Sequence, residues 1–199
     1  MNRTYKKMAD ILKPVKVGKA EIDIMDFTQK ELSFSMLRNG LRQDRYARLR
    51  IDGECMMSET PMEHDTNWDF VCHAHGDVLI GGLGIGMIIL AVQDCPEVHS
   101  ITVLEHSQDV IDAVKPQLPL NDKVRVIKAD VFAYKPDRRY DCIYMDIWAE
   151  ISTDVYPEMV RLKRRYGHYL KPKTESPKRF NHCWCEYYAR TGKPFPGFF

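Results

Sequence analysis

The sequence predicts an α/β protein built on a doubly wound, mostly parallel sheet. From residue 77 onward, short apolar runs of strand length alternate with segments whose apolar residues recur at helical spacing. Such alternation is typical of parallel strands joined by helical crossovers. The stretch DVLIGGLGIGMIIL, residues 77–90, places four glycines between an apolar strand and an apolar helix. A sharp turn at this point is where open α/β sheets approach their ligands.

The N-terminal third predicts strands and turns instead. The expected elements are a strand pair over 15–27, a helix over 28–40, a strand with an Asp-Gly turn over 46–59, and a loop leading into a short helix over 59–76. His64, Thr66 and Asn67 lie on that loop and either line a site or are ordinary loop residues. We therefore expect an N-terminal extension over 1–75 and a sheet domain over 76–199.

The sheet domain is expected to be truncated at its C-terminal edge. Its predicted strands cover 78–82, 100–105, 123–130 and 140–146, and its predicted helices cover 86–95, 107–118 and 152–170. Only 29 residues follow Leu170, so 180–188 is the one segment left for a fifth strand. A neighbouring subunit or the N-terminal hairpins would cover such an edge, and a homodimer is one expectation. The whole is Rossmann-like.

Three acidic residues stand where predicted strands end. Glu105, Asp130 and Asp146 each interrupt an apolar run at its carboxyl end, where parallel sheets bind ligands. Glu105 follows Gly82 by 23 residues, which suits a carboxylate that accepts hydrogen bonds from a ribose diol. Helix capping or turn formation is the structural alternative for Asp130 and Asp146. Asp77 begins the first strand and is expected on the far side.

A nicotinamide enzyme fits the same turn less well. The position three residues after Gly84 is Met87, where close packing of a dinucleotide-binding helix requires a small residue. The pair Tyr169 and Lys173 has the spacing of a dehydrogenase motif, but Pro172 would break the helix that must carry both. An adenosyl cofactor without nicotinamide is the better interpretation.

The segment 77–150 resembles the class I S-adenosylmethionine-dependent methyltransferases, specifically their spermidine-synthase-like branch. The resembling motifs are VLIGGLGIG, ITVLEHS, VIKADVFAY and YDCIYMDIW, and YARLRIDGECMMSE is similar to the β-hairpin lead-in of the aminopropyltransferases. The resemblance implies that S-adenosyl-L-methionine is bound by Gly82, Leu83, Gly84, Gly86, Glu105, His106, Asp130, Val131 and Phe132. It also implies that Asp146 faces the reacting end as a substrate-orienting carboxylate or base. Trp148 is either a stacking surface for a planar substrate or a hydrophobic plug.

Two departures from the branch favour methyl transfer over polyamine synthesis. The aminopropyltransferases carry an acid within the glycine turn, whereas GGLGIG has none. Their second acid after the fourth strand is replaced here by Asp146-Ile-Trp-Ala-Glu150. We therefore predict a methyltransferase of unknown acceptor, with a non-catalytic S-adenosylmethionine-binding regulator or an aminopropyltransferase as alternatives.

Composition constrains the partners only loosely. The basic stretch 161–173 suits nucleic acid, but it lies on a helix that must also cover the sheet, so this acceptor is not favoured. The glycine-broken apolar run near 78–92 is too short for a bilayer, and no membrane partner is expected. Six cysteines without a Cys-x-x-Cys pair predict reduced thiols in the cytoplasm. We expect no metal at the Cys/His segments 72–75 and 182–185.

Overall fold

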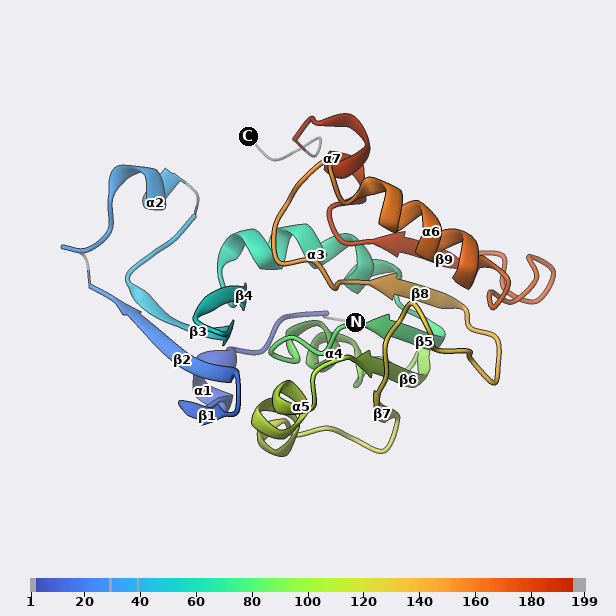
Figure 1. The fold of residues 1–199 in the computed structure, drawn as a ribbon, viewed down its shortest axis with the longest axis horizontal. Coiled ribbons are helices and arrows are strands. Elements are labelled where there is room, and N and C mark those ends of the chain that lie inside the picture. The colour runs from blue at the N-terminus through green and yellow to red at the C-terminus, as the bar shows by residue number, and fades with distance from the viewer. Residues whose placement is uncertain (1–2, 29, 39, 195–199) are drawn as a thin grey trace.

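Two sheets organise the chain, one parallel and one antiparallel (Figure 1). The computed structural model describes residues 3–28, 30–38 and 40–194. The parallel sheet contains β5 (Gly76–Gly81), β6 (Val98–Glu105), β7 (Val124–Lys128), β8 (Cys142–Met145) and β9 (Phe180–Cys183) in the order β7-β6-β5-β8-β9. All four neighbouring pairs are parallel. The predicted fold class is confirmed.

The strand order brings the predicted acids together. The chain proceeds outward from β5 through β6 to β7 and then returns to pair β8 with the other side of β5. The strand order therefore reverses beside β5, and a crevice opens at the carboxyl ends of β5 and its neighbours. Asp77, at the opposite end of β5, binds Lys171 and Ser100 and lies away from this crevice, as predicted.

Helices cover both faces of the parallel sheet. In β5, Val78 and Ile80 join a core that includes all six residues of α4 (Met87–Val92). Leu79 points the other way, into a second core with Leu162 of α6 (Tyr156–Gly167). The nearly unbroken apolar run of β5 reflects burial on both faces. Two further helices of this part of the chain are α5 (Gln108–Val114), which the 3₁₀ turn η1 (Lys115–Gln117) extends, and α7 (Glu186–Thr191).

The N-terminal extension forms an antiparallel sheet that shares the first core. It consists of β1 (Val15–Val17), β2 (Ala20–Phe27), β3 (Asp44–Ile51) and β4 (Glu54–Ser58), with α1 (Met8–Ile11) before it and α2 (Phe34–Arg38) between β2 and β3. Ile22 and Leu49 are buried in the same cluster as Val110 of α5. Because the core is continuous, the division into two domains at 75/76 stays a prediction.

Three sequence predictions need correction. Residues 59–76 are not mainly a loop: α3 (Pro61–His73) is a 13-residue helix with proline in its first turn, where the missing N–H costs nothing. Residues 186–188 begin α7 and do not extend β9. In 28–40, only Phe34–Arg38 is helical in the described residues, and positions 29 and 39 lie outside them.

The N-terminal sheet does not cover the edge of β9. It packs near α5, on the side of the molecule away from β9 (Figure 1). A homodimer across β9 therefore stays a prediction. In the described part of the chain, no helix is long and apolar enough to cross a membrane.

Candidate active site

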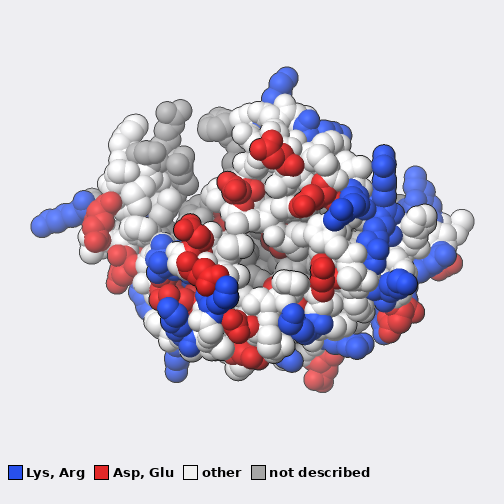
Figure 2. All heavy atoms as spheres, in the orientation of Figure 1, with Lys and Arg blue, Asp and Glu red and all other residues white. Residues whose placement is uncertain are grey.

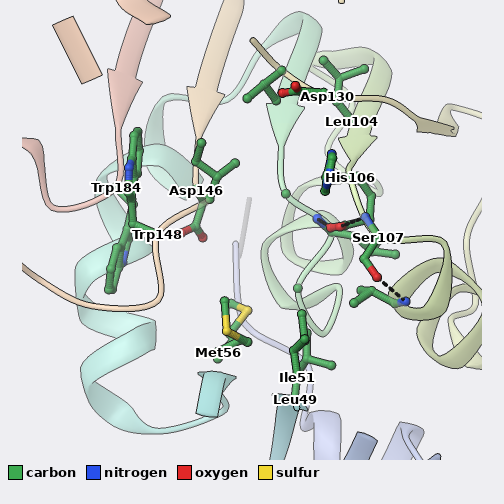
Figure 3. Close-up of a pocket in the computed structure, with 18 of the residues that line it drawn as sticks. Leu49, Ile51, Met56, Leu104, His106, Ser107, Asp130, Asp146, Trp148 and Trp184 are labelled. Carbon is green, nitrogen blue, oxygen red and sulfur yellow. Dashed lines mark hydrogen bonds between the residues drawn. The ribbon is translucent and has the colours of Figure 1, made fainter. Parts of the chain in front are cut away.

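A cavity of about 470 Å³ opens at the carboxyl ends of the parallel strands. The parallel sheet forms one wall, and β3, β4 and the start of α3 form the other (Figure 3). The volume lies within the range of about 300–1,000 Å³ that is usual for small-molecule sites. Its lining comprises Leu49, Ile51, Met56, Met57, Glu63, Gly82, Leu83, Gly84, Ile88, Leu104, Glu105, His106, Ser107, Val110, Ala129, Asp130, Val131, Phe132, Asp146, Ile147, Trp148 and Trp184.

The glycine turn forms the floor of the cavity. Gly82 has a φ of +99°, and a Cβ there would lie 2.1 Å from the main-chain oxygen of Asp146. Glycine is therefore required for β5 and β8 to end side by side. Gly86 is not among the lining residues. Gly86 is the N-cap residue of α4 and has a φ of +81°, and a Cβ at this position would meet the side chain of Leu118.

Glu105 links the glycine turn to the next strand-helix junction. Its Oε2 accepts a hydrogen bond from the Leu83 N–H at 2.9 Å, and its Oε1 accepts one from the Ser107 N–H at 2.7 Å (Figure 3). Ser107 Oγ in turn accepts from the Val110 N–H and caps α5. Each Glu105 oxygen retains lone pairs, so the carboxylate can still accept from a ligand in the cavity.

Asp130 and Phe132 line the cavity just after the end of β7. Asp130 Oδ1 accepts a hydrogen bond from the Phe132 N–H at 2.8 Å, which fixes the turn after β7. The guanidinium of Arg161 lies over the Phe132 ring, 4.6 Å from its centroid. The turn-forming role considered for Asp130 is thus present, and Asp130 also lines the cavity.

Asp146 and Glu63 face the cavity from opposite walls. Among the described residues, none donates a hydrogen bond to the Asp146 carboxylate or forms an ion pair with it, and burial raises its pKa to about 7. Glu63, on the first turn of α3, is only 7% exposed. Burial, and then the charge of Asp146, raise the pKa of Glu63 to about 8, against a lowering by the Ser58 N–H.

Two tryptophans stand beside Asp146 (Figure 3). Trp148 donates from Nε1 to Glu158 at 3.1 Å, and Trp184 donates from Nε1 to Thr66 Oγ1 at 3.0 Å. Both indoles line the cavity. Trp148 is therefore placed where a substrate could stack, and Trp184 lies immediately after β9.

Sequence reasoning missed Glu63 and Trp184. The sequence predicts a loop leading into a short helix around Glu63, and the candidate residues of that loop, His64, Thr66 and Asn67, do not line the cavity. Helical periodicity around Glu63 is weak, because polar residues occupy most of α3. Trp184 lay inside the expected fifth strand, and nothing in its local pattern pointed to a ligand.

The histidines and cysteines of the segments 72–75 and 182–185 are not among the lining residues, although Trp184 between Cys183 and Cys185 is. His75 Nδ1 lies 3.2 Å from Cys142 Sγ, and the Phe180 ring stacks with both His73 and His182. Within the described residues, no group of three or more histidine, cysteine or acidic side chains could hold a metal ion.

Comparisons with known proteins give remote structural similarity only. No protein-family model matches the chain, and no significant match was found among curated proteins. Solved structures that align with it include the N-methyltransferase NodS of Bradyrhizobium japonicum WM9 (14% identity, 56% of this chain, 64% of NodS, TM-score 0.45). The methyltransferase CcbJ of Streptomyces caelestis aligns at 17% identity over 55% of this chain and 45% of CcbJ, with a TM-score of 0.43.

The glycopeptide N-methyltransferase MtfA, solved with S-adenosyl-L-methionine, aligns at 19% identity over 54% of this chain and 45% of MtfA, with a TM-score of 0.42. The chain thus matches less than two thirds of the length of each of these structures. At these identities and TM-scores, the similarity assigns neither a reaction nor a substrate to this chain.

Proposed function

We propose that this chain is an S-adenosylmethionine-dependent methyltransferase. The observation that carries the proposal is the cavity at the strand-order reversal, where the glycine turn, Glu105, Asp130 and Asp146 meet. Each of these features comes from a different strand end, and only the fold brings them to one site.

The residues present fit an adenosyl cofactor. Glu105 is held by two N–H groups and keeps acceptor capacity for a ribose diol. The Phe132 N–H holds one oxygen of Asp130, and the carboxylate offers an acceptor for a base. Val131 and Phe132, which lie beside it, offer that base an apolar face. The bare Cα of Gly82 lets the main chain approach a ligand closely.

The remaining side chains suit a displacement reaction. When bound, S-adenosylmethionine would supply an electrophilic methyl group carried by a sulfonium. Asp146 orients the acceptor, and with a pKa of about 7 it can take up the acceptor's proton near neutral pH. The apolar side chains Met56, Met57 and Ile147 limit the access of water to this region.

A ligand titration tests the proposal directly. S-adenosylmethionine and S-adenosylhomocysteine should bind in calorimetry and raise the melting temperature, whereas NAD should do neither. At 100 times its Kd, a ligand adds about 2.7 kcal/mol to the stability. Stabilisation by NAD alone would refute the proposal. Transfer of labelled methyl groups to pooled nucleic acids, proteins or amines then tests turnover, and binding without turnover would favour the non-catalytic regulator.

A second candidate, aminopropyl transfer by a spermidine-synthase-like protein, has one specific observation in its favour. None of the cavity-lining residues is Lys or Arg, so no cationic side chain there pairs with the carboxylate of S-adenosylmethionine. The decarboxylated cofactor lacks that group. Tighter binding of the decarboxylated form than of S-adenosylmethionine would select this candidate.

A further inference from the structure

The cavity has two chemically different sides (Figure 3). His106, Ser107 and Asp130 lie on one side, near β6 and β7, and the proposed function assigns that side to the cofactor. Asp146, Trp148 and Trp184 lie on the other side, near β8 and β9. That assignment leaves the second side for the acceptor.

Carboxylates dominate the charge of the whole cavity. Its lining includes Glu63, Glu105, Asp130 and Asp146, but no lysine and no arginine. Figure 2 shows acidic side chains around the central hollow of this face, while basic side chains gather mainly toward its margins. Two cations stand beside the lining on the side of β6 and β7, because Arg161 lies over the Phe132 ring and Lys128 donates to the His106 carbonyl. The field that attracts cations is therefore strongest on the side of Glu63 and Asp146.

The pair Glu63 and Asp146 lacks a compensating charge. Glu63 is more than nine-tenths buried and faces the cavity, and only the Ser58 N–H moderates its carboxyl group. No described residue donates a hydrogen bond to the carboxylate of Asp146. Glu63 is buried and Asp146 is partly buried. Two such neighbouring carboxylates without a cation are costly, and a cationic ligand between them would reduce that cost.

The indoles supply the second half of a cation site. Trp148 and Trp184 are each fixed through Nε1, so their rings are held in place next to Asp146. A cation within about 6 Å of an indole face is stabilised by the ring quadrupole. Below them, Met56 and Ile51 offer an apolar surface for the carbon skeleton of a ligand (Figure 3).

We propose that Glu63, Asp146, Trp148 and Trp184 bind the acceptor as a small organic cation, an alkyl- or arylamine in its ammonium form. The inference rests on the proposed function, because it treats the opposite side of the cavity as the cofactor's. A phosphate backbone would meet only carboxylates here, and a neutral alcohol would leave them unpaired.

The same chemistry could also receive the ammonium group of the cofactor itself. The experiment therefore uses protein saturated with S-adenosylhomocysteine, which carries that ammonium group and cannot react. Calorimetric titration then compares benzylamine with benzyl alcohol, two probes of similar shape that differ in charge. A parallel titration compares S-adenosylhomocysteine with 5′-methylthioadenosine, which lacks the amino acid end.

Benzylamine should bind the loaded protein at least about tenfold more tightly than benzyl alcohol, a difference of about 1.4 kcal/mol. Glu63→Gln and Asp146→Asn should each reduce amine affinity by at least about tenfold and change the affinity for S-adenosylhomocysteine by less than about twofold. Glu150→Gln removes one charge from an exposed residue outside the lining, and it should change neither affinity. Circular dichroism checks that each variant is folded.

Three outcomes would overturn the inference, and each is distinct. If S-adenosylhomocysteine binds and benzylamine does not, the inference fails while the proposed function stands. If Glu63→Gln weakens S-adenosylhomocysteine but not 5′-methylthioadenosine, the carboxylates serve the cofactor's own ammonium group. If S-adenosylhomocysteine does not bind at all, the proposed function fails and the inference falls with it.

Discussion

Glu105 illustrates how one side chain can organise a site and still serve a ligand. Its two oxygens accept from the N–H groups of Leu83 and Ser107, which lie on different turns. Hydrogen bonds to a charged acceptor are worth about 1.5–3 kcal/mol each. The carboxylate therefore holds the glycine turn against β6 before any ligand arrives.

Glu105→Gln should lower the affinity for S-adenosylhomocysteine by about 10- to 100-fold, because an amide can accept with only one of its two ends. Calorimetry measures the change. Glu175→Gln, at an exposed residue far from the cavity lining, is the matched control and should bind as the natural chain does. Equal affinities for both variants would show that Glu105 does not contact the ligand.

Glu63 predicts a pH-dependent stability. Burial, and then Asp146, raise its pKa from 4.5 to about 8 in the folded chain. The stability contributed by a group with a raised pKa is fully present below the unfolded value and is lost as the pH rises through the folded value. Glu63→Gln stays neutral and escapes this loss.

The melting temperature of Glu63→Gln, relative to the natural chain, should therefore increase as the pH is raised from about 5 to about 9. Each kcal/mol of relative stability corresponds to about 2–4 °C in a chain of this size. Differential scanning calorimetry at several pH values measures the trend. A difference that does not change with pH would contradict the assignment of Glu63 as a buried, titrating group.

At the scale of secondary-structure elements, the ends of β5 and β8 decide the geometry of the site. The main-chain oxygen of Asp146 lies where a Cβ of residue 82 would stand. Gly82 also has a positive φ, which ordinary side chains rarely adopt. The backbone itself, and not a flexible side chain, excludes substitution here.

Gly82→Ala should reduce the free energy of unfolding by at least about 2 kcal/mol, because strain at such positions alone costs about 1–3 kcal/mol. Gly167→Ala is the matched control: its φ is not positive, and its Cβ would have nothing nearer than Asn181 at 4.0 Å. That variant should be neutral or more stable by up to about 1 kcal/mol. Urea unfolding compares the two, and equal losses would contradict the steric argument.

At the scale of the whole molecule, the N-terminal extension supplies one wall of the site. Met56 and Met57 of β4 line the cavity, and Leu49 and Ile51 of β3 lie beside them. The buried Glu59, 1% exposed, ties this sheet to α1. It accepts from the Met8 N–H at 2.5 Å and from the Ala9 N–H at 2.8 Å.

Glu59→Gln should destabilise the chain by about 1–3 kcal/mol, since a buried donor would lose its acceptor. Hydrogen exchange should show faster exchange at the amides of Met8 and Ala9. Binding of S-adenosylhomocysteine should weaken as well, because the wall formed by β4 loses its support. Unchanged exchange at both amides would contradict this account of Glu59.

Much of the fold could be predicted because strand burial leaves a local signature. The apolar runs at β5, β6 and β8 predict strands buried on two faces, and the strand-end positions of Glu105 and Asp146 follow from the same runs. The sequence predicts only a short helix after a loop where α3 has 13 residues, because its polar sequence carries little apolar periodicity. Its packing against the rest of the molecule stabilises it instead.

By itself, the sequence determined the parallel sheet, the glycine turn and the acidic residues at the strand ends. These depend on chain-local rules, since a strand buried on both faces must be apolar and must change character where it emerges. Only the tertiary structure decided that Glu63 and Trp184 join Asp146 and Trp148 in one cavity. Glu63 lies 83 residues before Asp146 and on a separate helix. Contacts between such distant segments arise from packing, which no local pattern encodes.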